Sequence, residues 1–267
     1  MTSLSILAAI LYVAASFRVA VCLYRQESDA GKIRHYLLPG FAGLICHFIV
    51  LYNGLRVGMD LNLGFFNAAS LMCWVITLFL LIVNLKKPVE NLAMLFLPFA
   101  AAFTVLAQLM PGQRITSGVF DLSLGLHILL SLAAYSLLTI AALQAVLLAI
   151  QEHQLRHKHV VQVLNILPPL KVMEDVLFGM IGTGFFCLSL SLVSGLMFIH
   201  DLFAQHLVHK TVLSLLAWVI FAILLWGRWS RGWRGVKAIR WTLGGFFTLM
   251  LAYFGSKLVL EIILDRV

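Results

Sequence analysis

The stretch from Gly125 to Gln151 constrains the fold most, because no Asp, Glu, Lys or Arg interrupts it. A helix needs about twenty apolar residues to cross the core of a bilayer, so this stretch predicts a membrane-spanning helix. His127 stands near its beginning, and Ser131 and Tyr135 follow at successive steps of four residues on neighbouring parts of one face. An ionisable imidazole in such a helix is a candidate functional residue.

Seven further apolar runs accompany this one, and 62% of the 267 residues are hydrophobic while only 11% are charged. This composition is typical of an integral membrane protein. We expect an all-α, polytopic bundle of about eight transmembrane helices, forming a single domain over residues 1–267, with the seventh helix near the short limit for a span. The predicted helices are Ser3–Tyr24, His35–Leu55, Leu63–Leu85, Leu92–Met110, Leu122–Gln151, Met173–Ile199, Thr211–Trp226 and Trp241–Leu264.

Basic residues lie mainly in alternate loops, the richest of which reads WGRWSRGWRGVKAIRW. Because positively charged loops stay on the cytoplasmic side, we expect a multi-pass membrane protein with both termini outside. The tryptophans of that loop are typical of a membrane interface. Because the basic residues lie mainly in these alternate loops, the net charge of +8 reflects membrane topology and does not indicate nucleic-acid binding. The opposite loops carry few basic residues: Arg56, Arg114, Lys210 and Arg266.

A second histidine, His47, stands inside the second predicted helix. A polar side chain at that depth needs a partner within the bundle. Gly40, Gly43 and Gly54 lie on its side of the helix and allow either a neighbouring helix or a flat cofactor to approach. Two interpretations stay open: His47 binds a cofactor, or it is a packing residue hydrogen-bonded to a Ser or Tyr.

Neutral imidazole is a common axial ligand of haem iron, and two histidines on different helices can hold the ring between them. His47 and His127 are both predicted in the outer half of the membrane. Haem propionates need cations at the membrane edge, and Arg56, Arg114 and Lys210 are the basic residues predicted there. Each of the three is otherwise an ordinary interface anchor.

Three stretches of the second half resemble the cytochrome c assembly family of haem-handling membrane proteins: LHILLSLAAYSLLTIAALQAVLLAIQ, LPPLKVMEDVLFGMIGTGFFCLSLSLVSGLMF and GWRGVKAIRWTLGGFFTLMLAYFGSKLVL. The likeness to these CcsA and HemX relatives covers residues 120–265, and a nearer likeness to the YpjD-type inner-membrane proteins runs over the whole chain. In the family, the histidine that opens the LH-x-x-x-S-x-x-x-Y helix is an outer-side haem ligand. The resemblance implies this role for His127.

The chain departs from the family at two places. Assembly proteins carry an outer segment of the form WGxxWxWDPKE, where this chain reads HDLFAQHLVHK and keeps only the lysine, Lys210. They also carry a second outer histidine after the last matched helix, and the stretch YFGSKLVLEIIL has none. The resemblance therefore implies haem binding, sensing or regulation more than attachment of haem to cytochrome c.

We therefore expect a haem-binding or haem-trafficking protein of the bacterial inner membrane that is not an enzyme. It would hold b-type haem non-covalently through His127 and His47, with Lys210 and Arg56 as further cofactor-binding residues. The alternative is a non-haem accessory or regulatory subunit that contacts a transporter or an enzyme through its helices. In that case its partners would be the lipid bilayer and another membrane protein. A transporter with a central polar path has the least support, because the helices hold so few charges.

Overall fold

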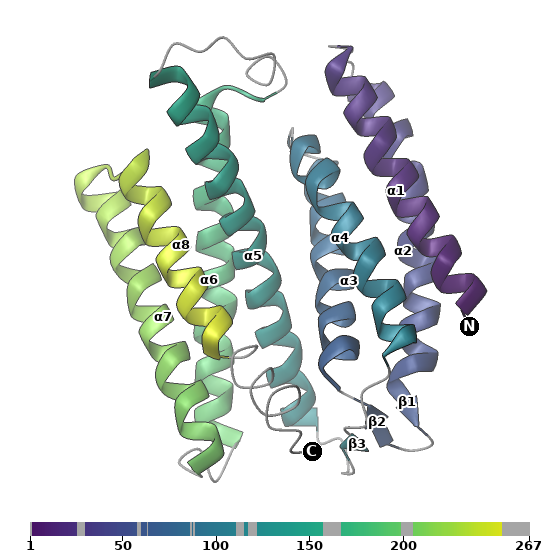
Figure 1. Cartoon of the computed structure of the whole chain (residues 1–267). Coiled ribbons are helices and arrows are strands. Elements are labelled where there is room, and N and C mark those ends of the chain that lie inside the picture. Colours follow the sequence, from purple (N-terminus) through teal and green to yellow (C-terminus); the bar gives the residue numbers. More distant parts are fainter. Residues whose placement is uncertain are drawn as a thin grey trace. The chain divides into compact units, whose positions relative to one another are not determined.

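The computed structural model describes residues 2–25, 30–57, 60–62, 64–85, 87, 89–110, 115–116, 122–156, 167–198 and 205–252. Helices dominate this part of the chain (Figure 1). They are α1 (Thr2–Tyr24), α2 (Ala30–Leu55), α3 (Phe65–Asn84), α4 (Glu90–Leu109), α5 (Leu122–Arg156), α6 (Leu170–Phe198), α7 (Gln205–Arg231) and α8 (Val236–Met250).

The predicted polytopic helical bundle is confirmed. Helices α1 to α7 are each long and apolar enough to cross a membrane. The seventh helix is longer than expected, because α7 has polar and basic residues at both ends, beyond the apolar run Thr211–Trp226. Helix α8 begins at Val236, five residues before the predicted start, and the second half of the predicted run, residues 253–264, lies outside the described residues. The outward orientation of both termini stays a prediction.

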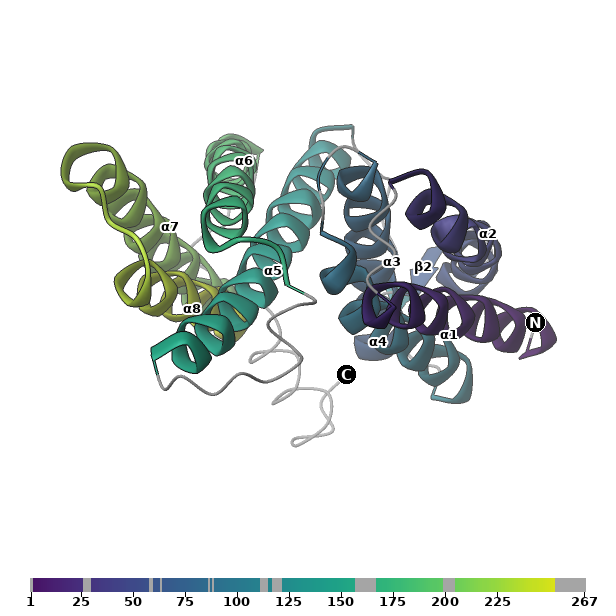
Figure 2. The same cartoon turned by 90° about the horizontal axis from the view of Figure 1, so that it is seen from above.

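The chain divides into two compact units, the first with α1 to α4 and the second with α5 to α8. In the first unit, α1 and α3 each pack against both α2 and α4. In the second unit, α5 and α7 each pack against both α6 and α8. Each unit is thus a four-helix bundle, as the view along the helices shows (Figure 2). The prediction of a single domain stays a prediction.

A small antiparallel sheet closes one end of the first unit and was absent from the sequence-based prediction. Its strands are β1 (Arg56–Val57), β2 (Asp60–Asn62) and β3 (Ile115–Thr116), in the order β1-β2-β3. Asn62 ties the sheet to α3, since its side-chain oxygen accepts the Gly64 N–H at 3.1 Å and its carbonyl accepts the Asn67 side-chain amide at 3.2 Å. The sheet therefore connects the α2–α3 and α4–α5 segments.

Close packing between α1 and α2 depends on Gly43. A Cβ atom at this position would lie 3.0 Å from Cδ1 of Tyr12 and 3.3 Å from the carbonyl oxygen of Ala8. At Gly40, one turn earlier, a Cβ would make ordinary contacts at 3.5 Å with Ala15 and Leu81. Gly43 thus lets the fully buried Tyr12 ring lie against the α2 backbone.

We predict that Gly43→Ala lowers the stability of the protein, because overpacking of this kind costs about 1–3 kcal/mol. Gly40→Ala is the matched control on the same face of α2, and it should leave stability unchanged or raise it through the better helix propensity of alanine. Thermal unfolding in detergent measures both variants. Equal unfolding temperatures for the two variants would contradict the close contact between Gly43 and Tyr12.

Candidate functional site

His47 lies at the centre of the first unit and is completely buried. Its Nδ1 atom lies 3.2 Å from the Tyr12 hydroxyl on α1, and its Nε2 atom lies 2.9 Å from the Ser70 hydroxyl on α3. The Thr104 hydroxyl on α4 lies 3.2 Å from both ring nitrogens. One imidazole on α2 therefore connects all four helices of the unit.

The hydrogen bonds of His47 leave neither ring nitrogen available. Thr104 donates its proton to the carbonyl of Ala100 at 2.7 Å, so its oxygen accepts from the N–H of the ring. The other ring nitrogen then accepts a proton from Tyr12 or Ser70, whichever faces it. This arrangement is the one expected of a hydrogen-bonded packing residue, and it does not fit an iron ligand.

His127 belongs to the second unit and is only half-buried, near the beginning of α5. Its Nδ1 atom lies 3.0 Å from the Ser191 carbonyl and 3.0 Å from the Ser194 hydroxyl, both on α6. A carbonyl oxygen only accepts, so Nδ1 carries the proton and the neutral ring has its lone pair on Nε2. Among the described residues, no hydrogen bond reaches Nε2.

The surroundings of His127 fix the ring in place. Ser194 donates to the Ser191 carbonyl at 2.9 Å, which leaves its oxygen to accept from Nδ1. Ser131 donates to the His127 carbonyl at 2.7 Å, and its oxygen lies 2.7 Å from the Ser191 hydroxyl. A Cβ at Gly195 would lie 3.1 Å from Cε1 of the imidazole, so the glycine leaves room for the ring. These contacts orient an imidazole whose Nε2 has no hydrogen-bond partner in the part of the chain that the structure describes.

The other predicted site residues lie on separate elements. Lys210 is half-buried in the second turn of α7, at the same end of the second unit as His127. Arg56 begins β1 in the first unit, and its side chain lies outside the described part of the structure. Arg114 also lies outside the described residues. Their role as partners of haem propionates stays a prediction.

Comparison with known proteins shows what the chain is related to. The model of the Cytochrome C assembly protein family matches residues 36–264. The chain belongs to this family. The inner membrane protein YpjD of Escherichia coli is 34% identical over 243 residues, which cover 89% of this chain and 90% of YpjD. The predicted family resemblance is thereby confirmed. Since seven helices of the described part of the chain are long and apolar enough to span a membrane, the protein is a multi-pass protein of the bacterial inner membrane.

Two further relatives show how far this family relationship extends. An uncharacterized 28.8 kDa protein of Azospirillum brasilense is 30% identical over 234 residues, which cover 85% of this chain and 84% of that protein. The cytochrome c biogenesis protein CcsA of Mesostigma viride is 29% identical over 91 residues, only 33% of this chain and 30% of CcsA. No solved structure matches the chain.

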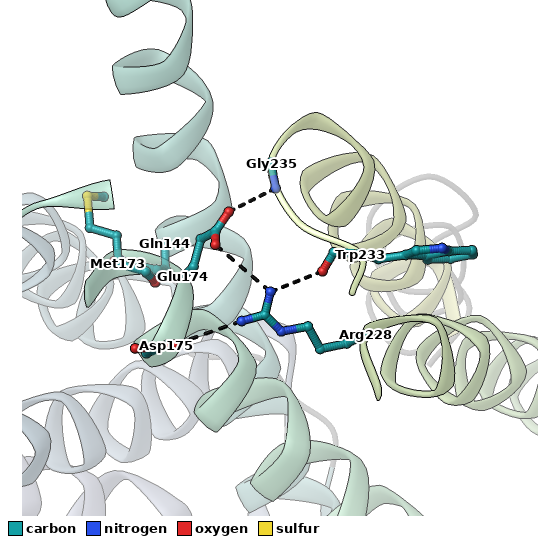
Figure 3. A network of polar contacts seen from close by, with 7 residues as sticks. All are labelled: Gln144, Met173, Glu174, Asp175, Arg228, Trp233 and Gly235. Carbon is teal, nitrogen blue, oxygen red and sulfur yellow. Dashed lines mark hydrogen bonds and ion pairs between the residues drawn. The ribbon is translucent and has the colours of Figure 1, made fainter. Parts of the chain in front are cut away.

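A second polar cluster lies at the end of the second unit where α6 begins and α7 ends, opposite His127. Figure 3 shows its residues from close by. The Glu174 carboxylate on α6 accepts the Gly235 N–H at 2.9 Å, and Arg228 on α7 lies 4.0 Å from its other oxygen. Arg228 also donates to the Trp233 carbonyl at 3.3 Å and lies 3.8 Å from Asp175. The cluster ties α6 to the turn between α7 and α8.

The turn between α7 and α8 is tighter than the long basic loop predicted for this segment. Only residues 232–235 separate the two helices, and Gly232 and Gly235 have positive φ angles of 64° and 60°. These angles favour glycine because residues with a Cβ rarely adopt them. The basic residues of the predicted loop therefore project mainly from helix ends.

Sequence reasoning missed the residues that orient the two histidines. Ser191, Ser194 and Gly195 form the pattern S-x-x-S-G in α6, which places two hydroxyls and a gap on one helix face. This pattern is a detectable signal for a polar partner. Ser70 and Thr104 offer no comparable signal, since neither has a second hydroxyl within four residues along its apolar helix.

We predict that His47→Ala destabilises the protein by about 2–4 kcal/mol, because it leaves a cavity and deprives buried hydroxyls of a partner. Asn53→Ala is the control on the same helix, since the exposed Asn53 amide donates to the Ile49 carbonyl of its own helix. Its effect should stay within about 0.5 kcal/mol. Unfolding in detergent measures both, and a His47→Ala variant as stable as wild type would refute the central role of His47.

Proposed function

We propose that this protein binds haem non-covalently in the bacterial inner membrane and serves haem trafficking or its regulation, without turning over a substrate. The observation that carries the proposal is the hydrogen bond from Nδ1 of His127 to the Ser191 carbonyl. Metal-binding histidines commonly donate their other N–H to a backbone carbonyl, which fixes the tautomer and the ring orientation. His127 has this arrangement.

His127 fits an axial ligand in three respects. Its Nε2 carries the lone pair, its ring is held by α6, and its half-buried position gives access from outside the bundle. When bound, haem would supply an iron centre that an imidazole nitrogen can ligate, and His127 would hold it through Nε2. Lys210, at the same end of the second unit, is the proposed cation for a propionate, and Arg56 is a further candidate.

His47 does not fit a second haem ligand, because hydroxyl groups from three helices occupy both ring nitrogens. We therefore assign the ligand role to His127 and a packing role to His47. Family membership supports a haem-related role, since the relative CcsA is named for cytochrome c biogenesis. The proposed partners are the lipid bilayer and haem.

The packed state of His47 also suits the alternative, a non-haem accessory or regulatory subunit that contacts another membrane protein through its helices. The two functions differ in one observable property. A haem-binding protein takes up stoichiometric haem, while the accessory subunit stays colourless and is recovered together with a membrane partner.

We predict that purified wild-type protein takes up haem and that His127→Ala lowers its occupancy at least tenfold, because the open nitrogen is lost. Oxidised and reduced visible spectra after haem addition measure the occupancy. His153→Ala is the matched control, with an exposed histidine at the far end of the same helix, and it should retain haem. A colourless wild type would overturn the proposed function.

A second prediction tests the orientation of the His127 ring without removing it. Gly195→Ala should weaken haem binding about tenfold, because the added Cβ at 3.1 Å displaces the imidazole. Gly182→Ala is the control on α6, where a Cβ meets no atom within 4 Å. Haem titration compares the two folded variants. Equal affinities would show that the position of the ring relative to α6 does not matter for binding.

A further inference from the structure

A cavity of about 390 Å³ opens at the end of the second unit that lies opposite His127. It lies between the end of α5, the beginning of α6 and the turn that leads into α8. Its volume is within the range of cavities that bind small molecules. The proposed haem ligand does not line it, so the cavity is independent of the proposed function.

The charges around this cavity are of both signs. Glu152 on α5 and Glu174 on α6 line it on one side, and Arg234 and Lys237 line it on the other. Three apolar side chains, among them Leu148, complete the lining. A ligand that carries one positive and one negative group would find a partner for each, whereas a simple anion or cation would face charges of its own sign.

The carboxylates of Glu174 and Glu152 both lie close to Gly235, in the turn between α7 and α8. Glu174 accepts the Gly235 N–H with one oxygen and lies near Arg228 with the other, so its carboxylate points at the turn (Figure 3). A Cβ at Gly235 would lie 3.4 Å from Glu152, so the glycine lets this second carboxylate approach. Arg234 and Lys237 are exposed, and the Lys237 ammonium lies 3.8 Å above the Trp233 ring.

The neighbouring tryptophans place this end of the unit at the level of lipid headgroups. Trp226 and Trp229 are 58% and 89% exposed at the end of α7, and tryptophans at such positions are typical of the membrane–water interface. The basic residues around them indicate the cytoplasmic leaflet. The cavity is thus placed where the polar headgroups of phospholipids lie.

We propose that this cavity binds a phosphoethanolamine group, the headgroup of an aminophospholipid of the inner leaflet. The ammonium donates hydrogen bonds to Glu152, with Glu174 adding negative charge, and the phosphate accepts from Arg234 and Lys237. An ethanolamine ammonium has N–H donors for a carboxylate, whereas the quaternary ammonium of choline has none. The site therefore prefers phosphatidylethanolamine to both phosphatidylcholine and phosphatidylglycerol.

The proposal is tested by exchanging the purified protein into nanodiscs with equal parts of these three lipids and measuring retained lipids by native mass spectrometry. We expect phosphatidylethanolamine to be enriched, and Glu152→Gln to lower its retention about tenfold or more, as the loss of a hydrogen bond to a charged group implies. Asp175→Asn is the control, since Asp175 is an acidic residue of α6 that does not line the cavity. It should retain wild-type selectivity.

Arg234→Gln provides an independent test on an exposed side chain, where folding is not at risk. It should lower phosphatidylethanolamine retention with an unchanged unfolding temperature. Soluble glycerophosphoethanolamine should compete for the site in detergent with wild type and not with Glu152→Gln. Such competition without enrichment of phosphatidylethanolamine from the nanodiscs would assign the site to a soluble ligand instead. Equal retention of the three lipids by wild type, or unchanged selectivity in both cavity variants, would overturn the proposal.

Discussion

The structure depends on one constraint: a polar group inside an apolar helical bundle must find its hydrogen-bond partner on the chain itself, because lipid offers none. In the first unit this constraint gathers four helices around one imidazole. Ser16 on α1 also donates to the Met94 carbonyl at 2.7 Å, and Trp74 on α3 donates to the Leu44 carbonyl at 2.9 Å. These bonds fix how the helices pack, since packing of apolar side chains in lipid specifies little by itself.

The same constraint gives the two membrane histidines different properties. His47 is enclosed by hydroxyl groups, so its ring serves the packing of the first unit. His127 is held through Nδ1 by a single neighbouring helix, which leaves Nε2 without a partner among the described residues. An imidazole that is oriented and open on one side can coordinate a metal without any rearrangement of the helices around it. This difference separates the proposed functional residue from the structural one.

Much of the fold could be predicted, because long apolar runs bounded by charges specify spanning helices. The ends of the helices were harder to predict. Helix α7 continues through Arg228 and Arg231, because Arg228 pairs with Glu174 and Asp175 and Arg231 lies over the Trp226 ring while the backbone stays helical. The strands were missed because two or three residues such as Arg56–Val57 show no periodicity. His127 was identified by its helix and the family motif, but its open nitrogen follows from Ser191, a contact 64 residues away along the chain.

The most direct test of the claim that His127 binds haem iron is to replace its side chain with free imidazole from solution. His127→Gly removes the ligand and leaves a space that imidazole can enter beside Ser191 and Ser194. If Nε2 of His127 binds haem iron, the variant should lose haem and recover most of its absorption spectrum when imidazole is added. A His127→Gly variant that binds haem as tightly as wild type, with no response to imidazole, would show that the iron ligand is another residue.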